Sequence, residues 1–525
     1  MIPPRRGLWL LKRCILGFVI AAAYMHAGSF ATLKEVIDHY AAGGKMDHPN
    51  KSRILRTFRL TDGEKGDPLW LGYDRRAEEV PMGRIPTLAL LIAPVALAAQ
   101  APVTFNKDVL PILETHCQEC HRPGEVAPMS FMTYKDTRPW AKAIKAAVVS
   151  KKMPPWFMNA AYGHFANERK LSNADIATLT TWADNGAAEG DAKDAPPPVK
   201  FADGWSIGTP DMVVEFPHDI QIPATNVPME QSNVLVKVNF PHDVWVKAAE
   251  VRPGNPRVVH HMKAWVRPPG STWMADAPEG ELFKPSRAQF AEPVGSAAAR
   301  KVDATPNGPR PAQEILAKYN PGVNAQEFTI GGAAKFIAAG SDIVFECHYT
   351  PTGKPETDRS RVGLVFASAP PEQRYVTITG VSNDRFVIPA HASNYEVKAE
   401  ATVQYDTELA WVQPHMHLRA KDYQLSAYYP SGESEILMKG GFDFNWQLGY
   451  EFAKPIVLPK GTRLETIAHF DNSENNPYNP NPNIDVKYGP QTTDEMAVSF
   501  MGFIIDVQAD PARLFPRRGR VEVVE

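Results

Sequence analysis

The sequence predicts a multi-domain protein, with a small all-α domain followed by two all-β domains of the sandwich or jelly-roll class. The chain has 525 residues, which is enough for about three domains. Helical signals are concentrated in residues 102–192, whereas short β-branched and aromatic runs separated by turn-forming residues fill the chain after residue 205. The 48 prolines are typical of loop-rich β structure rather than of a helical bundle.

Composition excludes several classes of function. The formal net charge of -3 is nearly balanced, so the chain has no basic surplus that would indicate nucleic acid as a partner. A mean hydropathy of -0.30 excludes a polytopic membrane protein. The four cysteines are Cys14, Cys117, Cys120 and Cys347, and only the middle pair forms a local motif, so no disulfide framework is indicated.

Residues 82–101 have the pattern of a secretory signal peptide. A short basic start, Met82-Gly83-Arg84, precedes an apolar run from Leu88 to Ala99, and Ala96-Leu97-Ala98 is a suitable cleavage site. About 12 strongly apolar residues are too few to cross a bilayer comfortably. We therefore expect a periplasmic or secreted protein with no stable membrane span in the mature chain.

Residues 1–81 precede this signal, where a signal peptide would ordinarily be first. The stretch from Tyr24 to Phe30, with residues 33–44, resembles the C-terminal tail of dihaem cytochrome c peroxidases, but no haem-attachment motif accompanies it. We interpret residues 1–81 as a non-native upstream extension. The alternative is a first signal or anchor formed by Arg5-Arg6 and the run from Cys14 to Ala23. N-terminal sequencing of the exported protein distinguishes the two.

The motif Cys117-Gln118-Glu119-Cys120-His121 is the attachment pattern of c-type haem. Two thiols at this spacing can add to the two vinyl groups of one haem, and the adjacent histidine can ligate the iron. The alternative is half of a zinc site, but no second cysteine pair is present to complete one.

Helical signals flank this motif in the order found in class I cytochromes c, which residues 102–192 resemble. An amphipathic helix is expected from Val109 to Thr115, and a capped helix from Leu171 towards Gly186. Met153, before Pro154-Pro155, matches the distal Met-Pro segment of that family, and a Met/His pair suits electron transfer. The competing distal ligands are Met129, Met158 and His164.

Residues 193–204 read as a Pro-rich linker, and two β-sandwich domains are expected at 205–365 and 366–525. The long Gly-, Pro- and Ala-rich segment from Pro268 to Ala339 predicts loops and one short helix around Ala312 to Tyr319. Phe-Pro-His-Asp occurs twice, and we expect its histidines, His218 and His242, to be solvated.

Three histidine motifs lie in the β region. In the extended segment 412–418, His415 and His417 are two residues apart, so their side chains point to one face and could hold one metal ion. His260 and His261 are adjacent, so sharing an ion requires a bulge or a strand end. His348 ends another strand-like run. Alone, the pair His415 and His417 is as typical of a solvated strand face, and each of the other two motifs is more typical of a histidine at a strand end.

Taken in order with Met496, these motifs resemble the copper type II, ascorbate-dependent monooxygenases across residues 205–525. This is the family of peptidylglycine alpha-hydroxylating monooxygenase and dopamine beta-monooxygenase. The resemblance implies two copper ions: an electron-transfer copper in the first β domain and a catalytic copper in the second. The implied ligand sets are His260, His261 and His348 for the first and His415, His417 and Met496 for the second.

The residue types agree with copper independently of the resemblance. Imidazole suits copper and a thioether favours Cu(I), whereas zinc prefers thiolate, imidazole or carboxylate. Met501 is a competing thioether that we assign to the core. Cys347 is expected to pack on the opposite strand face from His348 as a small apolar residue.

The expected activity is hydroxylation of a C–H bond of a small organic substrate with O2. Electrons would enter through one covalently bound haem c from a periplasmic donor or an ascorbate-like reductant. The alternatives are a periplasmic haem and copper electron-transfer or copper-binding protein without hydroxylase activity, and β domains that bind a carbohydrate or peptide. Gln413 and Phe500 replace the arginine and tyrosine that bind the substrate carboxylate in the peptide hydroxylase, so a C-terminal glycine peptide is not the expected substrate.

Overall fold

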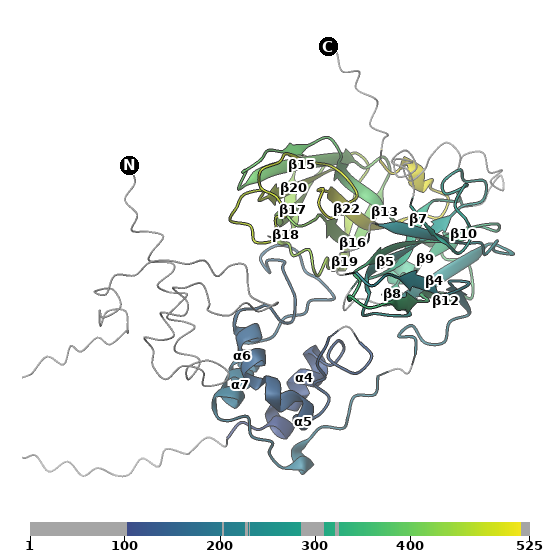
Figure 1. The fold of residues 1–525 in the computed structure, drawn as a ribbon. Coiled ribbons are helices and arrows are strands. Elements are labelled where there is room, and N and C mark those ends of the chain that lie inside the picture. The colour runs from purple at the N-terminus through teal and green to yellow at the C-terminus, as the bar shows by residue number, and fades with distance from the viewer. Residues whose placement is uncertain are drawn as a thin grey trace, which may run out of the picture. The chain divides into compact units, whose positions relative to one another are not determined.

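The computed structural model describes residues 102–125, 127–201, 204–225, 229, 231–284, 309–320 and 325–515. The predicted signal peptide and the upstream extension lie outside these residues. Within them the protein is mostly β-sheet with a small group of helices at the N-terminal end, which confirms the β-rich class (Figure 1). No helix among the described residues is long and apolar enough to cross a membrane.

Short helices make up the N-terminal part of this region. They are the π-helical turn η2 (Phe105–Val109), α4 (Leu110–His116), α5 (Tyr134–Thr137), η3 (Arg138–Trp140), α6 (Ala141–Val149), α7 (Asn173–Asp184) and η4 (Ala192–Asp194). Helix α7 begins where the capping signal predicted, because Ser172 and Asp175 form a reciprocal capping box. Its buried Trp182 packs against Phe105, at 5.9 Å between ring centroids, and closes a separate helical core.

A nine-stranded sheet runs through the β region. Its order is β1 (Met212–Glu215), β12 (Arg361–Phe366), β4 (Val244–Arg252), β9 (Ala333–Ile337), β13 (Gln373–Asn383), β22 (Ala497–Asp506), β16 (Thr407–His415) and β19 (Tyr450–Leu458), and β8 (Ala325–Glu327) pairs with β4. Neighbouring strands are antiparallel except β9 and β13, which meet in parallel. One continuous sheet therefore crosses the predicted domain boundary near residue 366.

Two smaller sheets cover this large one. A five-stranded sheet has the order β6 (Leu282–Phe283), β3 (Ser232–Val236), β10 (Asp342–Tyr349), β5 (Val259–Arg267) and β7 (Glu314–Tyr319). A four-stranded sheet has the order β15 (Tyr395–Thr402), β20 (Arg463–Phe470), β17 (Ala420–Tyr428) and β18 (Ser434–Gly441). The remaining elements are the pairs β2 (Ile220–Ile222) with β11 (Glu356–Asp358) and β14 (Val387–Ile388) with β21 (Val486–Lys487), and the turns η5 (Ile330–Gly332) and η6 (Pro511–Arg513).

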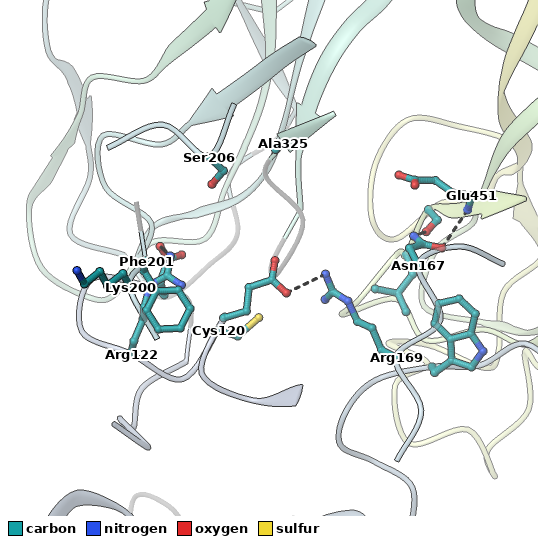
Figure 2. A pocket seen from close by; sticks show the side chains of 14 residues that line it. Cys120, Arg122, Asn167, Arg169, Lys200, Phe201, Ser206, Ala325 and Glu451 are labelled. Carbon is teal, nitrogen blue, oxygen red and sulfur yellow. Dashed lines mark hydrogen bonds and ion pairs between the residues drawn. The ribbon is translucent and has the colours of Figure 1, made fainter. Parts of the chain in front are cut away.

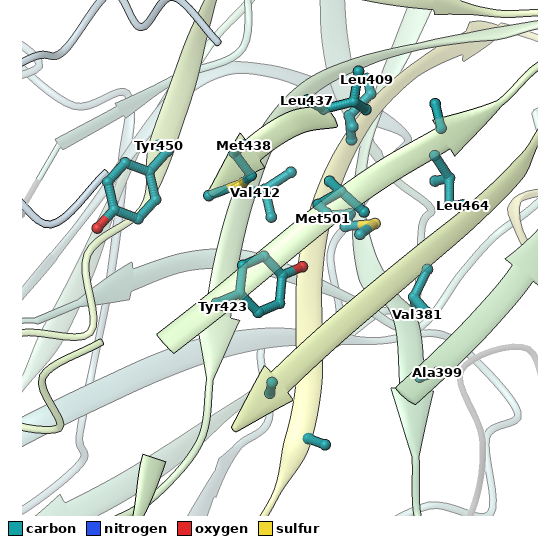
Figure 3. Close-up of a cluster of buried hydrophobic side chains, with 14 of the residues drawn as sticks. Val381, Ala399, Leu409, Val412, Tyr423, Leu437, Met438, Tyr450, Leu464 and Met501 are labelled. Carbon is teal, nitrogen blue, oxygen red and sulfur yellow. The ribbon is translucent and has the colours of Figure 1, made fainter. Parts of the chain in front are cut away.

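Alternation along the strands produces two sandwich cores. The first sandwich buries one face of the five-stranded sheet, including Phe345 and Cys347, against β4 and β12. The second buries the four-stranded sheet against β13, β22 and β16, and Figure 3 shows Val412 and Met501 in that core beside Tyr423. The expectations that Met501 and Cys347 are core residues are confirmed, since neither has exposed surface.

Strand β7 corrects one prediction. Residues 312–319 were expected to form a short helix, but Glu314–Tyr319 pairs antiparallel with β5 and all six residues are buried. A short apolar run buried on both faces has no periodicity that separates helix from strand. Pairing with β5 decides the conformation, and the polar residues Glu314 and Lys318 bond to Lys335 and Gln413 on the nine-stranded sheet.

The parallel junction between β9 and β13 contains a buried ionic cluster. Glu314 accepts from Lys335 Nζ through Oε2 at 2.8 Å and from Arg374 through Oε1 at 2.9 Å. Lys335 also donates to the carbonyl of Ile315 and to the hydroxyl of Thr377. Since the three ionic side chains are at most 1% exposed, their charges must be balanced within the cluster.

The segment between α6 and α7 pairs with the second sandwich. The Ala166 N–H donates to the Glu451 carbonyl at 2.8 Å, and the Ala453 N–H donates to the His164 carbonyl at 2.8 Å. Phe165 and Phe452 form a bridge between these bonds. The segment thus adds to the free edge of β19 like a short extra strand.

Candidate metal centre

The first histidine set lies where β5 begins and β10 ends. In the β5–β10 ladder His348 faces His261 and Tyr349 faces Val259, so His260 is the extra residue of a bulge. The bulge turns two adjacent imidazoles towards one point, which a regular strand would place on opposite faces. The structure thus has both a bulge and a strand end at these histidines, the condition expected for two adjacent imidazoles to reach one ion.

These three imidazoles form a compact group. One potential ligand nitrogen from each of His260, His261 and His348 lies within 4.8 Å of the other two. The Nδ1 atoms of His260 and His261 are 3.2 Å apart, and the His261 and His348 rings meet edge-on with centroids 4.9 Å apart. Three neutral imidazoles at this spacing are a donor set suited to copper or zinc.

The second histidine set lies at the end of β16. The strand ends at His415, which faces Val498 of β22, and His417 lies two residues beyond, outside the strand. The two rings are 5.4 Å apart between centroids and almost perpendicular. His417 Nδ1–H donates to the Asp494 carbonyl at 3.2 Å, since a carbonyl can only accept, and its Nε2 is therefore the nitrogen left for a metal.

Glu495 joins this set to Met496. Its buried carboxylate accepts from the backbone N–H groups of His417 at 2.8 Å, Arg419 at 2.7 Å and Met496 at 3.3 Å. Antiparallel extension of the β16–β22 register likewise places position 496 opposite position 417. Met496 is partly buried and packs with the aromatic cluster that contains Trp411 and Phe500.

The structure brings the two histidine sets into one centre. The rings of His261 and His415 are 6.5 Å apart between centroids, edge to face. Phe444 contacts both sets, with its ring 5.4 Å from that of His260 and 6.1 Å from that of His417. We call these five histidines the histidine centre; it lies between the five-stranded sheet and β16.

Burial keeps the imidazoles in their neutral, ligating form. It lowers the pKa of His348 to about 3 and that of His417 to about 4, because a charged imidazole would lose its hydration there. Neighbouring imidazoles lower the pKa of His348 further, and the ammonium of Lys263 lowers the pKa of both His348 and His417. Lys263 is itself paired with Glu346, with 2.6 Å between Nζ and Oε1.

These pKa shifts predict acid sensitivity of the metal-free protein. The pKa of a histidine in an unfolded chain is about 6.5. Between that pH and about pH 3, the folded pKa of His348, the unfolded chain therefore binds a proton at His348 that the folded chain does not. This contribution to stability is complete above about pH 6.5 and is lost as the pH falls. Wild type should therefore lose up to about 1.4 kcal/mol more per pH unit below pH 6.5 than His348→Gln.

Urea denaturation of both metal-free proteins between about pH 7 and about pH 5 measures this difference. Burial raises the pKa of Glu495 to about 7, which acts in the opposite direction but equally in both proteins. Equal pH slopes for the two proteins would contradict the prediction.

The two positions that depart from the peptide hydroxylase are filled by internal contacts. Gln413 accepts from Lys318 Nζ and donates to the Gln447 carbonyl, and it is 2% exposed. The ring centroid of Phe500 lies 4.5 Å from Lys263 Nζ and 5.5 Å from the ring centroid of His415. Neither side chain offers a free charge to a substrate carboxylate.

The haem-attachment motif follows α4 directly. Cys117 and Cys120 are free thiols, and burial raises their pKa to about 12 and about 11. His121 Nδ1–H donates to the Met129 carbonyl at 3.2 Å and its ring stacks on Phe131 at 4.2 Å. His121 is thereby fixed with Nε2 as its available ligand atom, which is the arrangement that an axial ligand requires.

The structure places the four candidates for the opposite ligand, Met153, Met129, Met158 and His164, in different surroundings. It is partly buried beyond α6, and its N–H donates to the Ala147 carbonyl at 3.3 Å. Met129 uses its carbonyl to hold His121, and Met158 is buried in the second sandwich core. His164 lies in the segment paired with β19. Met153 therefore stays a prediction for the ligand opposite His121.

A cavity of about 390 Å³ lies beside Cys120 (Figure 2). Its wall includes Trp156, Leu448 and Gly449, and the last two follow Gln447 in the chain. Asn167 spans the edge of the cavity by donating to the Gly449 carbonyl at 2.9 Å and accepting from the Glu451 N–H at 3.0 Å. The attachment motif and the loop that reaches the histidine centre therefore line the same cavity.

Three residues that contact the histidine centre were not predicted from sequence: Phe444, Gln447 and Glu495. Phe444 and Gln447 belong to an irregular loop without a motif, so no sequence signal points to them. Glu495 has a weak signal, since it stands next to Met496. The expected solvation of His218 and His242 is confirmed, as both are exposed.

Comparisons with known proteins give no family. No family model matches the chain, and no curated protein matches it. Among solved structures, PNGF-II has a TM-score of 0.23 and 9% identity over 53% of this chain and 60% of that chain. The infectious bursal disease virus VP2 subviral particle has a TM-score of 0.17 and 8% identity over 58% of this chain and 75% of that one. TM-scores this low carry no argument about fold or function.

Proposed function

We propose that the protein is an exported copper-dependent monooxygenase that hydroxylates a C–H bond of a small organic substrate with O2. The observation that carries the proposal is the approach of His260, His261 and His348 to within 4.8 Å, beside the pair His415 and His417. Motifs separated by up to 157 positions in the sequence converge on one buried point. Unrelated histidines at strand ends would not be expected to converge on one point.

The residues fit two copper ions by their chemistry. His260, His261 and His348 would hold the first ion, and His415, His417 and Met496 the second. Low pKa values keep the imidazoles unprotonated, and the thioether of Met496 suits Cu(I). Glu495 holds the backbones of His417 and Met496 to one carboxylate, so both ligands approach from fixed positions.

Bound copper would supply the activation of O2 and the electrons that hydroxylation needs. The protein's own part is to position the ligands and to keep water out. His261, His415 and His417 are each at most 7% exposed, and Phe444 lies over the edge of the centre. Because Gln413 and Phe500 present no free charge, a neutral, weakly polar substrate fits better than a carboxylate-bearing peptide.

A covalently attached haem c would donate electrons to the histidine centre. Cys117 and Cys120 would hold its vinyl groups, His121 would be one axial ligand and Met153 the other. A periplasmic donor or an ascorbate-like reductant would be the electron source. Tethering the haem domain to the copper domains raises the effective concentration of the donor, which is a physical reason for the fusion.

An electron-transfer or copper-binding protein without hydroxylase activity is the second candidate. The close packing of both histidine sets favours it, since the centre as it stands is well shielded from a substrate. Substrate-dependent oxygen consumption separates the two candidates. Met496→Ala should abolish that consumption in a monooxygenase while the haem is still reduced.

Copper and haem quantitation of the full exported chain tests the proposal directly. We expect about two copper ions per chain with type II electron paramagnetic resonance signals. We also expect one covalent haem, which is lost in the double variant Cys117→Ala/Cys120→Ala. Fewer than about one copper ion per chain after copper loading would contradict the proposed function.

A further inference from the structure

The Gln447 side chain contacts the Nδ1 atom of His415. Its Oε1 lies 2.7 Å from His415 Nδ1, and both residues are buried, at 5% and 6% exposed. It comes from the loop between β18 and β19, 32 positions from His415 in the sequence. No motif of the histidine centre includes it.

The backbone of Gln447 is held in an unusual conformation. Its φ of 38° lies in the left-handed region, which a glutamine adopts only at an energetic cost. Two side-chain amides fix the residue, because Asn320 Nδ2 donates to its carbonyl at 3.0 Å and Gln413 Nε2 donates to the same oxygen. A costly conformation that several contacts enforce is typical of a residue with a functional position.

The orientation of Gln413 follows from its two partners. The Gln447 carbonyl can only accept, so the amide nitrogen of Gln413 must face it and the amide oxygen of Gln413 accepts from Lys318 Nζ. Lys318 also packs its ammonium 3.8 Å from the centroid of the Trp411 ring. The contacts Lys318–Gln413–Gln447–His415 thus form one buried series that ends on a proposed copper ligand.

We propose that Gln447 is a positioning residue that fixes His415 in the tautomer with Nδ1–H, so that Nε2 is presented to the metal. The inference rests on the proposed function. His417 has the same arrangement, with Nδ1–H held by the Asp494 carbonyl. Two histidines that share one ion through Nε2 each need an oxygen acceptor at Nδ1, and for His415 that acceptor is the Gln447 amide.

The amide nitrogen of Gln447 supports this role. It is buried and has no hydrogen-bond partner among the described residues. A glutamine with a merely structural role would be expected to satisfy both ends of its amide. In Gln447 the amide oxygen contacts His415 while the amide nitrogen stays unsatisfied. The contact with the imidazole therefore decides where the Gln447 side chain lies.

The test measures Cu(I) affinity by competition with a chromogenic chelator, in a His348→Ala background that removes the first set. Gln447→Leu should weaken binding at the second set about 10- to 100-fold, as the loss of such a partner typically does. Gln447→Glu keeps an oxygen acceptor and should restore binding to at least the level of the background protein. Gln404→Leu, at an exposed position, is the matched control and should have no effect.

Thermal unfolding of each metal-free protein separates positioning from folding. Cu(I) affinity unchanged in Gln447→Leu would overturn the inference and leave the proposed function standing. If Gln447→Leu does not fold, Gln447→Glu decides, and a more than about tenfold loss of affinity there would overturn the inference. A background protein that binds no Cu(I) would overturn the proposed function, and the inference with it.

Discussion

Replacing Glu314 by glutamine is expected to lower the free energy of unfolding by about 3–5 kcal/mol. The substitution keeps the shape of the side chain but removes the carboxylate that contacts both Lys335 and Arg374 in their cluster. Two cations would then remain buried without a counter-charge, and burial already lowers the pKa of Lys335. Because β7, β9 and β13 meet here, the loss falls on the junction of the two sandwiches.

Urea denaturation followed by tryptophan fluorescence measures this change. The matched control is Asp184→Asn, which breaks the exposed pair with Lys145 and should cost at most about 1 kcal/mol. A loss below about 1 kcal/mol for Glu314→Gln would show that water or backbone groups compensate the two cations. The haem-attachment motif lies in the separate helical core, so covalent haem content should be unchanged.

Replacing His415 by alanine is expected to lower copper affinity at the second set by more than about 100-fold. Loss of an outer partner typically costs 10- to 100-fold, and loss of a ligand removes the bond itself. The remaining His417 and Met496 are too few to hold an ion firmly. In a monooxygenase, substrate-dependent oxygen consumption should disappear with the second copper.

The control for this experiment is the variant His391→Ala. His391 is exposed, pairs with Glu474 and contacts none of the five histidines in the centre. Copper content should fall by about one ion in His415→Ala and stay unchanged in His391→Ala. If both variants kept the full copper content, the second set would not be a copper site.

The two histidine sets lie close together, with the His261 and His415 ring centroids 6.5 Å apart. Sequence motifs imply two ligand sets but leave their separation open. The contact between the His261 and His415 rings arises because the outer face of the five-stranded sheet packs against β16 and β22 through a shared aromatic cluster. Trp265 comes from one side of that interface, and Trp411 and Phe500 from the other.

Much of the fold could be predicted from local patterns. The capping box at Ser172 starts α7, and β-branched runs such as 375–378 lie within strands. The assignment of Cys347 to the core followed from alternation along a strand. The helix expected at 312–319 was wrong, because its conformation depends on pairing with β5 rather than on its own residues.

By itself the sequence determined the residue types of the centre. Cys117, Cys120 and His121, the five histidines and Met496 are visible as short motifs, because ligand chemistry restricts which residues can serve. Tertiary structure alone decided which of them meet. The bulge at His260, the contact of His261 with His415 and the placement of Gln447 depend on strand register and on packing between sheets. Contacts of that kind join positions far apart in the chain, and no local pattern of residues encodes them.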